Sequence, residues 1–334
     1  MHGHPRHRHP IVAMRQLPVE DIAAVYDRAG DDYVAYADGD PKRLFHFEGL
    51  HAYADRCLWS LLETKLCDLR TTGATSISIL DAGCGPGTWL RRLVTHARRL
   101  GFSSITARGF DVAQAQIHVA RRMAHDLAEL PGVSLTFEVA DLTDQLSSVD
   151  ASIDMTLCLY SVLSHLPVEC LPKVAAEMAR VTRGHFITTV RSIGSPPTIF
   201  VDSIEKARHL RLDHSLNRCE VELRSGRRIA LPFHLFSACE LRNCFAQLFD
   251  IEDLRGLDIF HNRFTPDRRW NPASLLVDQQ LSCRLAQLEE TYARNPSFME
   301  RATHLLLVGC ARSRSKDIDM GAPLRSVDRA YLAR

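Results

Sequence analysis

The sequence predicts an α/β fold built on a parallel β-sheet with helices on both faces. Between residues 76 and 192, short apolar runs alternate with amphipathic stretches of helical period, and a glycine-rich loop at residues 83–87 follows the first run. Strands that alternate with helices are typical of parallel sheets. Ligands of such sheets bind at the carboxyl ends of the strands. The loop therefore marks the expected binding site.

The expected elements follow one another in a regular order along the chain. Ile22, Val25, Tyr26 and Ala29 repeat at helical spacing before Gly30, and a second helix is expected from about residue 48 to 69. Strands are expected at 76–83, 104–112, 133–142, 151–163 and 184–192, with helices at 88–101, 113–130 and 168–183. Further along come a helix at 202–213, a hairpin at 220–231, a helix at 237–248, and strands at 249–257 and 303–313.

Length, charge and cysteine usage limit the class of protein. The 334 residues suffice for one large α/β domain with insertions or for two domains. With 41 Lys+Arg against 40 Asp+Glu, no global field attracts nucleic acid or an anionic membrane. Ten cysteines without a C-x-x-C pair indicate reduced thiols, and no apolar stretch approaches the roughly 20 residues that span a bilayer. We expect a cytoplasmic protein without nucleic-acid or membrane partners.

The loop "DAGCGPG" favours a positively charged ligand over a dinucleotide. Gly83, Gly85 and Gly87 form G-x-G-x-G, whereas the dinucleotide fingerprint needs a glycine or alanine where Thr88 stands. Asp81, at the strand end, would repel a pyrophosphate and attract an ammonium group. These features suit S-adenosylmethionine, with its amine and sulfonium, better than NAD. The alternative is a glycine turn that only packs a helix on a strand.

Acidic residues also end the next two expected strands. Asp111 lies about 25 residues beyond the loop, where a carboxylate can accept both ribose hydroxyl protons. Asp141 and Leu142 form a polar and apolar pair suited to an adenine edge and face. Each acid alone could simply cap the following helix. Three acids at successive strand ends indicate one cofactor site.

With these motifs, residues 26–311 resemble the class I S-adenosylmethionine-dependent methyltransferases. "LDAGCGPGTWL" is similar to the family's motif I, "FDV" with Asp111 and Val112 to its ribose-binding segment, and "VADLTD" to its adenine-contacting segment. "IDMTLCLYSVLSHLP", which holds Leu159, is similar to the fourth-strand motif beneath the methionine part. The resemblance implies a Rossmann-like, seven-stranded, mostly parallel sheet with an antiparallel last strand. It also implies S-adenosyl-L-methionine as co-substrate and methyl transfer to an O or N atom of a small-molecule metabolite.

Composition and resemblance together divide the chain into four parts. We expect a disordered His-rich tail at 1–14, a helical N-terminal lid at 15–70, the methyltransferase domain at 71–314, and a flexible C-terminal tail at 315–334. The domain carries insertions at about 193–235 and 258–300. Long insertions usually carry function or form an interface, so these would build the acceptor pocket or a homodimer contact.

Candidate acceptor-side residues lie in the lid and after the fourth strand. Tyr26, Tyr33 and Tyr36 are expected to face the methyl group, with half-buried packing as the alternative for each. His165 follows the fourth strand and is the expected general base. His234 is a second candidate, for which a packing role is favoured, and Tyr160 could shape the surroundings of the sulfonium through its ring face. No metal site is expected.

Rival activities leave recognisable motifs, and most are absent. Nucleic-acid methyltransferases typically present N/D-P-P-Y/F at the end of strand four, where this chain has "CLYSVL". Protein arginine methylation would need a pair of glutamates there, and only Glu169 is near. RNA or protein methylation is therefore less favoured. Cyclisation or alkyl transfer that releases methylthioadenosine from the same cofactor stays open, as does binding without turnover.

Overall fold

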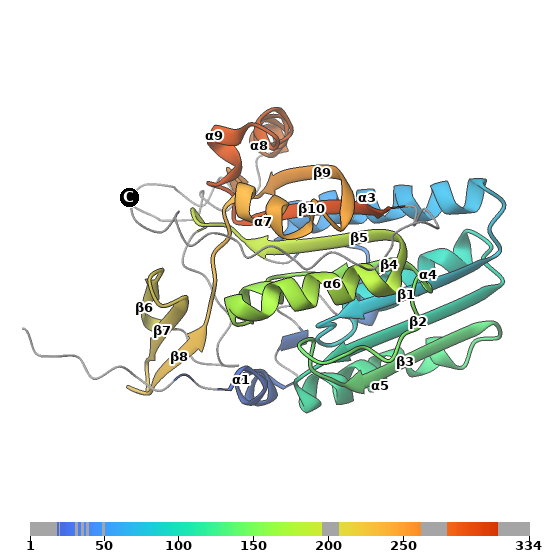
Figure 1. The fold of residues 1–334 in the computed structure, drawn as a ribbon, viewed down its shortest axis with the longest axis horizontal. Coiled ribbons are helices and arrows are strands. Elements are labelled where there is room, and N and C mark those ends of the chain that lie inside the picture. The colour runs from blue at the N-terminus through green and yellow to red at the C-terminus, as the bar shows by residue number, and fades with distance from the viewer. Residues whose placement is uncertain are drawn as a thin grey trace, which may run out of the picture.

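A seven-stranded sheet forms the centre of the fold, in the order β3-β2-β1-β4-β5-β10-β9 (Figure 1). The computed structural model describes residues 19, 21–30, 33–34, 37, 40–48, 51–195, 207–261 and 279–312. β1 to β5 are parallel, and β10 runs antiparallel to both of its neighbours. The strands are β1 Ser76–Ala82, β2 Ser104–Asp111, β3 Val133–Val139, β4 Ile153–Cys158, β5 Thr182–Arg191, β9 Phe249–Leu257 and β10 His304–Ala311. The expected fold class is confirmed.

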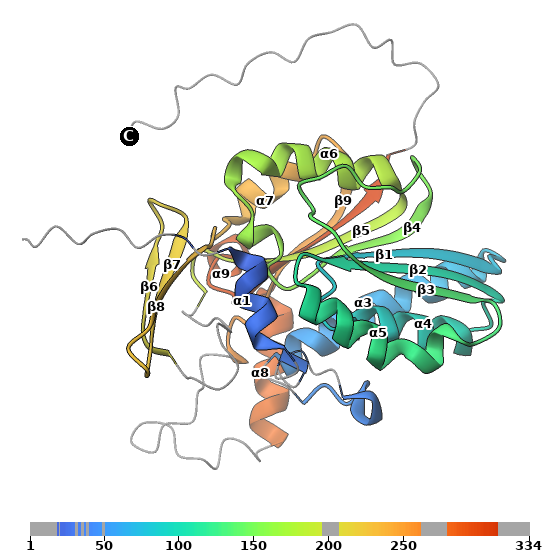
Figure 2. The same ribbon diagram turned by 90° about the horizontal axis from the view of Figure 1, so that it is seen from below.

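Helices cover both faces of this sheet (Figure 2). One face carries α3 Ala52–Thr71, α4 Thr88–Arg99 and α5 Gln114–Ala128, and the other carries α6 Leu171–Val181 and α7 Ala238–Phe245. Each helix buries an apolar stripe; on α3, for example, Leu58, Leu62 and Leu66 recur at every fourth position and are fully buried. None of the helices in the described ranges combines the length and apolar character needed to cross a bilayer.

The N-terminal segment packs across the end of α5. Asp21 caps α1 Ile22–Ala29 by accepting from the Ala23 N–H, and a 3-10 turn, η1, follows at Pro41–Arg43. The Gln116 side-chain amide of α5 donates to the carbonyls of Tyr26 and Gly30, both at 3.1 Å. These bonds fix α1 beside the carboxyl edge of the sheet. The expected tails at 1–14 and 315–334 lie outside the described residues.

The first insertion forms a second, three-stranded antiparallel sheet. Its strands are β6 Ala207–Asp213, β7 Arg218–Leu223 and β8 Arg228–Pro232. The expected hairpin is confirmed, but the helix expected over 202–213 is wrong from residue 207 onward, and residues 202–206 lie outside the described residues. Leu210 and Leu212 alternate with polar residues and pack on the apolar cluster of β7 and β8. This alternation of apolar and polar side chains is typical of a strand, and the segment therefore forms a strand and not a helix.

Smaller differences concern where elements end. β4 stops at Cys158, and two 3-10 turns, η2 Leu163–His165 and η3 Val168–Cys170, connect it to α6. The second insertion contributes α8 Gln279–Tyr292 and α9 Pro296–Met299. Its segment "HNRFTPDRRWNP" falls almost wholly outside the described residues. The turn after β4 brings residues 159–165 under the lid.

Candidate functional site

A cavity of about 440 Å³ opens at the carboxyl ends of β1, β2 and β4. Its walls come from the sheet edge, from α1, and from residues at the end of β8. Twelve of the residues expected from the sequence line it: Tyr26, Tyr33, Asp81, Gly83, Gly85, Asp111, Val112, Asp141, Leu142, Leu159, Tyr160 and His165. The strand-end motifs and the lid tyrosines therefore converge on one space.

Two of the expected residues that the structure describes, Gly87 and His234, do not line this cavity. Gly87 begins α4 with φ +73°, and a Cβ there would lie 2.7 Å from Phe137 Cε1, so this glycine serves helix packing. The ring of His234 is held by Asn217 Oδ1 at 2.8 Å and Glu240 Oε1 at 2.7 Å. We therefore do not retain His234 as a base. Tyr36 lies outside the described residues.

Two carboxylates lie at the base of the glycine loop. Asp81 is 2% exposed, and its burial, with Asp111 nearby, raises its pKa to about 7. The Asp111 oxygens accept from the Gly85 and Ala113 N–H groups, both at 2.9 Å, and burial raises the pKa of this residue as well. An ionised Asp81 here would be stabilised by the ammonium group of a ligand, as expected from the sequence.

The loop glycines allow the backbone to lie close to other walls of the cavity. Gly83 has φ +74°, and a Cβ there would lie 2.4 Å from the Val162 side chain. Gly85 has φ +52°, and its Cβ would point toward the lid, 3.5 Å from Tyr33 Cε1. Only glycine adopts these conformations without strain. The space above Gly85 is thus bounded by a lid tyrosine.

His165 is fixed between the second sheet and the lid. Its Nδ1 lies 3.1 Å from the Pro232 carbonyl oxygen, and its Nε2 lies 3.1 Å from the Tyr26 hydroxyl. Because a carbonyl can only accept, Nδ1 carries the proton and Nε2 accepts from Tyr26. Burial lowers the pKa of His165 to about 4. The imidazole is therefore neutral at physiological pH, with its basic nitrogen on the lid side.

Tyr160 occupies a strained position on the opposite wall. It has φ +53°, and Ser161 follows with φ +73°. Residues other than glycine rarely adopt these backbone conformations. The Tyr160 hydroxyl donates to the Asp55 carboxylate, and its ring stacks near Trp89, 6.1 Å between centroids. Burial is the largest cause that raises the pKa of Tyr160 well above its ordinary value, and the neighbouring Asp55 charge raises it further. It therefore remains a neutral hydroxyl.

Sequence reasoning missed four polar residues of this wall. His51, Asp55, Arg191 and His304 are buried and line the cavity. They come from the start and first turn of α3, the end of β5 and the start of β10. Burial lowers the pKa of His304 well below its ordinary value. No local motif marks them, because only the sheet topology brings them together.

Comparison with known proteins identifies the domain around the loop. Residues 79–185 match the family described as "Methyltransferase domain". No curated protein matches the sequence.

Several solved structures share features of the fold. Magnesium protoporphyrin IX methyltransferase from Synechocystis, solved with bound SAH, is 15% identical, with 84% of this chain and 97% of that chain covered and a TM-score of 0.43. The cyclase SpnF is 17% identical, with coverages of 89% and 99% and a TM-score of 0.48. Geranyl diphosphate C-methyltransferase from Streptomyces coelicolor is 16% identical, with both coverages 72% and a TM-score of 0.41.

Asp111→Ala is expected to weaken S-adenosylhomocysteine binding by about 1.5–3 kcal/mol, because the charge-assisted contact expected with the ribose would be lost and the Gly85 N–H would lose its acceptor. Titration calorimetry measures this effect. Asp126→Ala, at an exposed position, is the matched control and should bind as the wild type does. Unchanged affinity in Asp111→Ala would place the ribose elsewhere.

Gly85→Val is expected to abolish cofactor binding, because a branched side chain would enter the space between the loop and Tyr33. Gly226→Val is its matched control: Gly226 also has positive φ, at +85°, but nothing lies within 4 Å of its Cβ position. Both variants carry backbone strain, so only the effect of filling the cavity differs. Calorimetry with S-adenosylhomocysteine should show binding in Gly226→Val alone; normal binding in Gly85→Val would make the loop a packing turn.

Proposed function

Because the chain is a class I S-adenosylmethionine-dependent methyltransferase, we propose that it transfers the methyl group to an oxygen or nitrogen atom of a small-molecule metabolite. The observation that carries this proposal is the neutral His165, whose basic nitrogen faces the lid within the cofactor cavity. Such a group can accept the proton that an O–H or N–H acceptor loses on methylation.

For methyl transfer, the protein mainly has to position the acceptor against the cofactor. The methyl group of a sulfonium is already activated, so the acceptor lone pair must be held in line with the C–S bond at about 3 Å, with water excluded. Asp81 and Asp111 would hold the amine and ribose of the cofactor. Tyr26 and His165 would then meet the acceptor from the lid side, where the Tyr26 hydroxyl can pass a proton to Nε2.

The size of the cavity supports a small acceptor. About 440 Å³ lies near the lower end of the range for small-molecule sites, and it must receive both cofactor and acceptor. α1 and the end of β8 cover it from the solvent side, with Tyr26, Tyr33 and Phe233 in the wall. A folded macromolecule would have to displace this cover to present an acceptor atom.

A product analysis tests the reaction class. Incubation of the protein with methyl-labelled S-adenosylmethionine and a cell extract should place the label in a low-molecular-weight product and release S-adenosylhomocysteine in equal amount. Mass spectrometry of the labelled fraction would identify the acceptor. Methylthioadenosine as the coproduct would instead indicate cyclisation or alkyl transfer, and label in RNA or protein would contradict a metabolite acceptor.

His165→Ala is expected to lower the turnover rate about 10²–10⁴-fold while cofactor affinity stays unchanged, because only the base is removed. His118→Ala, an exposed histidine of α5, is the control. The pH profile adds a second readout. Because the pKa of His165 is about 4, the wild-type rate should stay level on acidification through the ordinary histidine range and fall only as pH approaches 4, where Nε2 takes up a proton.

Full activity in His165→Ala would mean that the acceptor needs no base or that another group supplies it. A fall in the wild-type rate centred on the ordinary histidine pKa would assign the base to a different residue. These two outcomes separate the role of His165 from the reaction class itself.

A further inference from the structure

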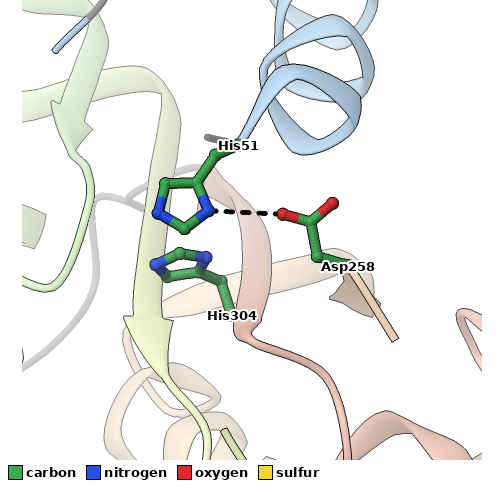
Figure 3. Close-up of side chains that lie close together, drawn as sticks. All are labelled: His51, Asp258 and His304. Atoms are coloured by element: carbon green, nitrogen blue, oxygen red, sulfur yellow. Dashed lines mark ion pairs between the residues drawn. The ribbon is translucent and has the colours of Figure 1, made fainter. Parts of the chain in front are cut away.

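Strand direction gathers three ligand-type side chains at one edge of the sheet. β9 runs in the same direction as β5, so Asp258, which follows its last residue, lies at the carboxyl edge. β10 runs the opposite way and begins there with His304, which pairs with Leu257. His51 precedes the first turn of α3 and reaches the same point from the helical layer. Figure 3 shows the two imidazoles and the carboxylate converging.

The three side chains are close together and removed from solvent. His51, Asp258 and His304 are 7%, 1% and 2% exposed. One ligand atom from each lies within 4.8 Å of the other two, and His51 Nδ1 is 3.4 Å from Asp258 Oδ2 (Figure 3). That separation exceeds the usual length of an N–H···O bond, about 2.7–3.2 Å. It equals the spacing of about 3.4 Å between two ligand atoms that each lie about 2.1 Å from a tetrahedral ion.

We propose that His51, Asp258 and His304 bind a divalent transition-metal ion such as Zn²⁺ or Fe²⁺. Two imidazoles and one carboxylate are a frequent protein ligand set for such ions, and three protein ligands leave positions open for another molecule. The open positions would face the cavity, because His51 and His304 line it whereas Asp258 lies behind them.

A simple ion pair does not account for the whole cluster. Protonated His51 beside Asp258 would explain those two side chains, but His304 would remain without a role. Its Nδ1 is buried and has no hydrogen-bond partner among the described residues. A buried, unsatisfied nitrogen is costly in free energy, and a coordinated ion would satisfy it.

The two other clusters of this kind in the described residues are already occupied. Glu289, which approaches Asp258 and His261, accepts from the N–H groups of residues 259, 260 and 261 at 2.6–3.0 Å. Glu252, which approaches His185 and Cys310, pairs with the Lys65 ammonium at 2.7 Å.

A metal ion on this wall would select the acceptor. An ion at His51 and His304 lies beside Tyr160 and in the same cavity as the cofactor loop, so it would favour acceptors with an oxygen or nitrogen that can coordinate it. This role rests on the proposed function, whereas the presence of the site does not. The test therefore measures metal binding directly.

The experiment titrates Co²⁺ into the full-length, chelator-treated protein and follows visible absorption. Co²⁺ is an informative probe because four- and five-coordinate nitrogen and oxygen sites give bands that hydrated Co²⁺ lacks. The wild type should bind one equivalent with these bands, and His304→Gln and Asp258→Asn should each bind it at least about 10-fold more weakly. His118→Gln is the matched control and should behave as the wild type. The tail histidines, His2, His4, His7 and His9, are present in every variant, so their binding cancels in the comparison.

Two further measurements keep the test decisive. The circular dichroism spectrum shows whether each variant is folded, and Zn²⁺ should raise the unfolding temperature of the wild type more than that of His51→Gln. Equal Co²⁺ spectra and affinities in the wild type and a folded His304→Gln variant would overturn the metal site. Equal Zn²⁺ shifts in the wild type and His51→Gln would do the same. Metal binding in a protein that releases no S-adenosylhomocysteine would support the site and contradict only the proposed reaction.

Discussion

The direction of β10 decides which of its side chains reach the cavity. Because it runs antiparallel between β5 and β9, its first residue lies where those strands end, and His304 stands opposite both Arg191 and Leu257. Leu305, Leu306 and Leu307 are fully buried immediately after it, so this end of the strand is packed into the core. A slip of one residue would turn His304 to the opposite face. The wall of the cavity at His304 therefore depends on one strand whose apolar side chains are fixed in the core.

The cavity unites two regions with different chemistry. At the glycine loop, buried carboxylates provide negative potential for a cationic cofactor. On the lid side, His165 is neutral because its burial disfavours the imidazolium, and the Pro232 carbonyl fixes its tautomer. The backbone strain at Tyr160 and Ser161, both with positive φ, lies on the wall that joins these regions. Such strain persists only where surrounding packing enforces it.

Most of what could be predicted from the sequence rested on local patterns of apolar, acidic and glycine residues. Asp81 and Asp111 could be placed because each stands at the end of a buried strand. Tyr26 and Tyr33 could be placed because their segment resembles the lid of the methyltransferase family. The strand β6 was missed because the alternation of Leu210 and Leu212 with polar residues is too short to distinguish a strand from a helix. His51, Asp258 and His304 could not be found from sequence, because they lie far apart along the chain and meet only through strand order. Gly87 matched the motif but serves packing, which pattern alone cannot distinguish.

If Asp81 holds the cofactor amine as proposed, its raised pKa would also make cofactor exchange sensitive to proton concentration. With a pKa near 7, a substantial fraction of Asp81 is protonated in the empty site at neutral pH. An ammonium group beside it favours the carboxylate, so cofactor binding should release protons and strengthen as pH rises through this value. Loss of the sulfonium charge on methyl transfer removes part of that attraction while the amine stays. The departing product would thus be held less firmly than the cofactor that replaces it, which favours exchange after each turnover.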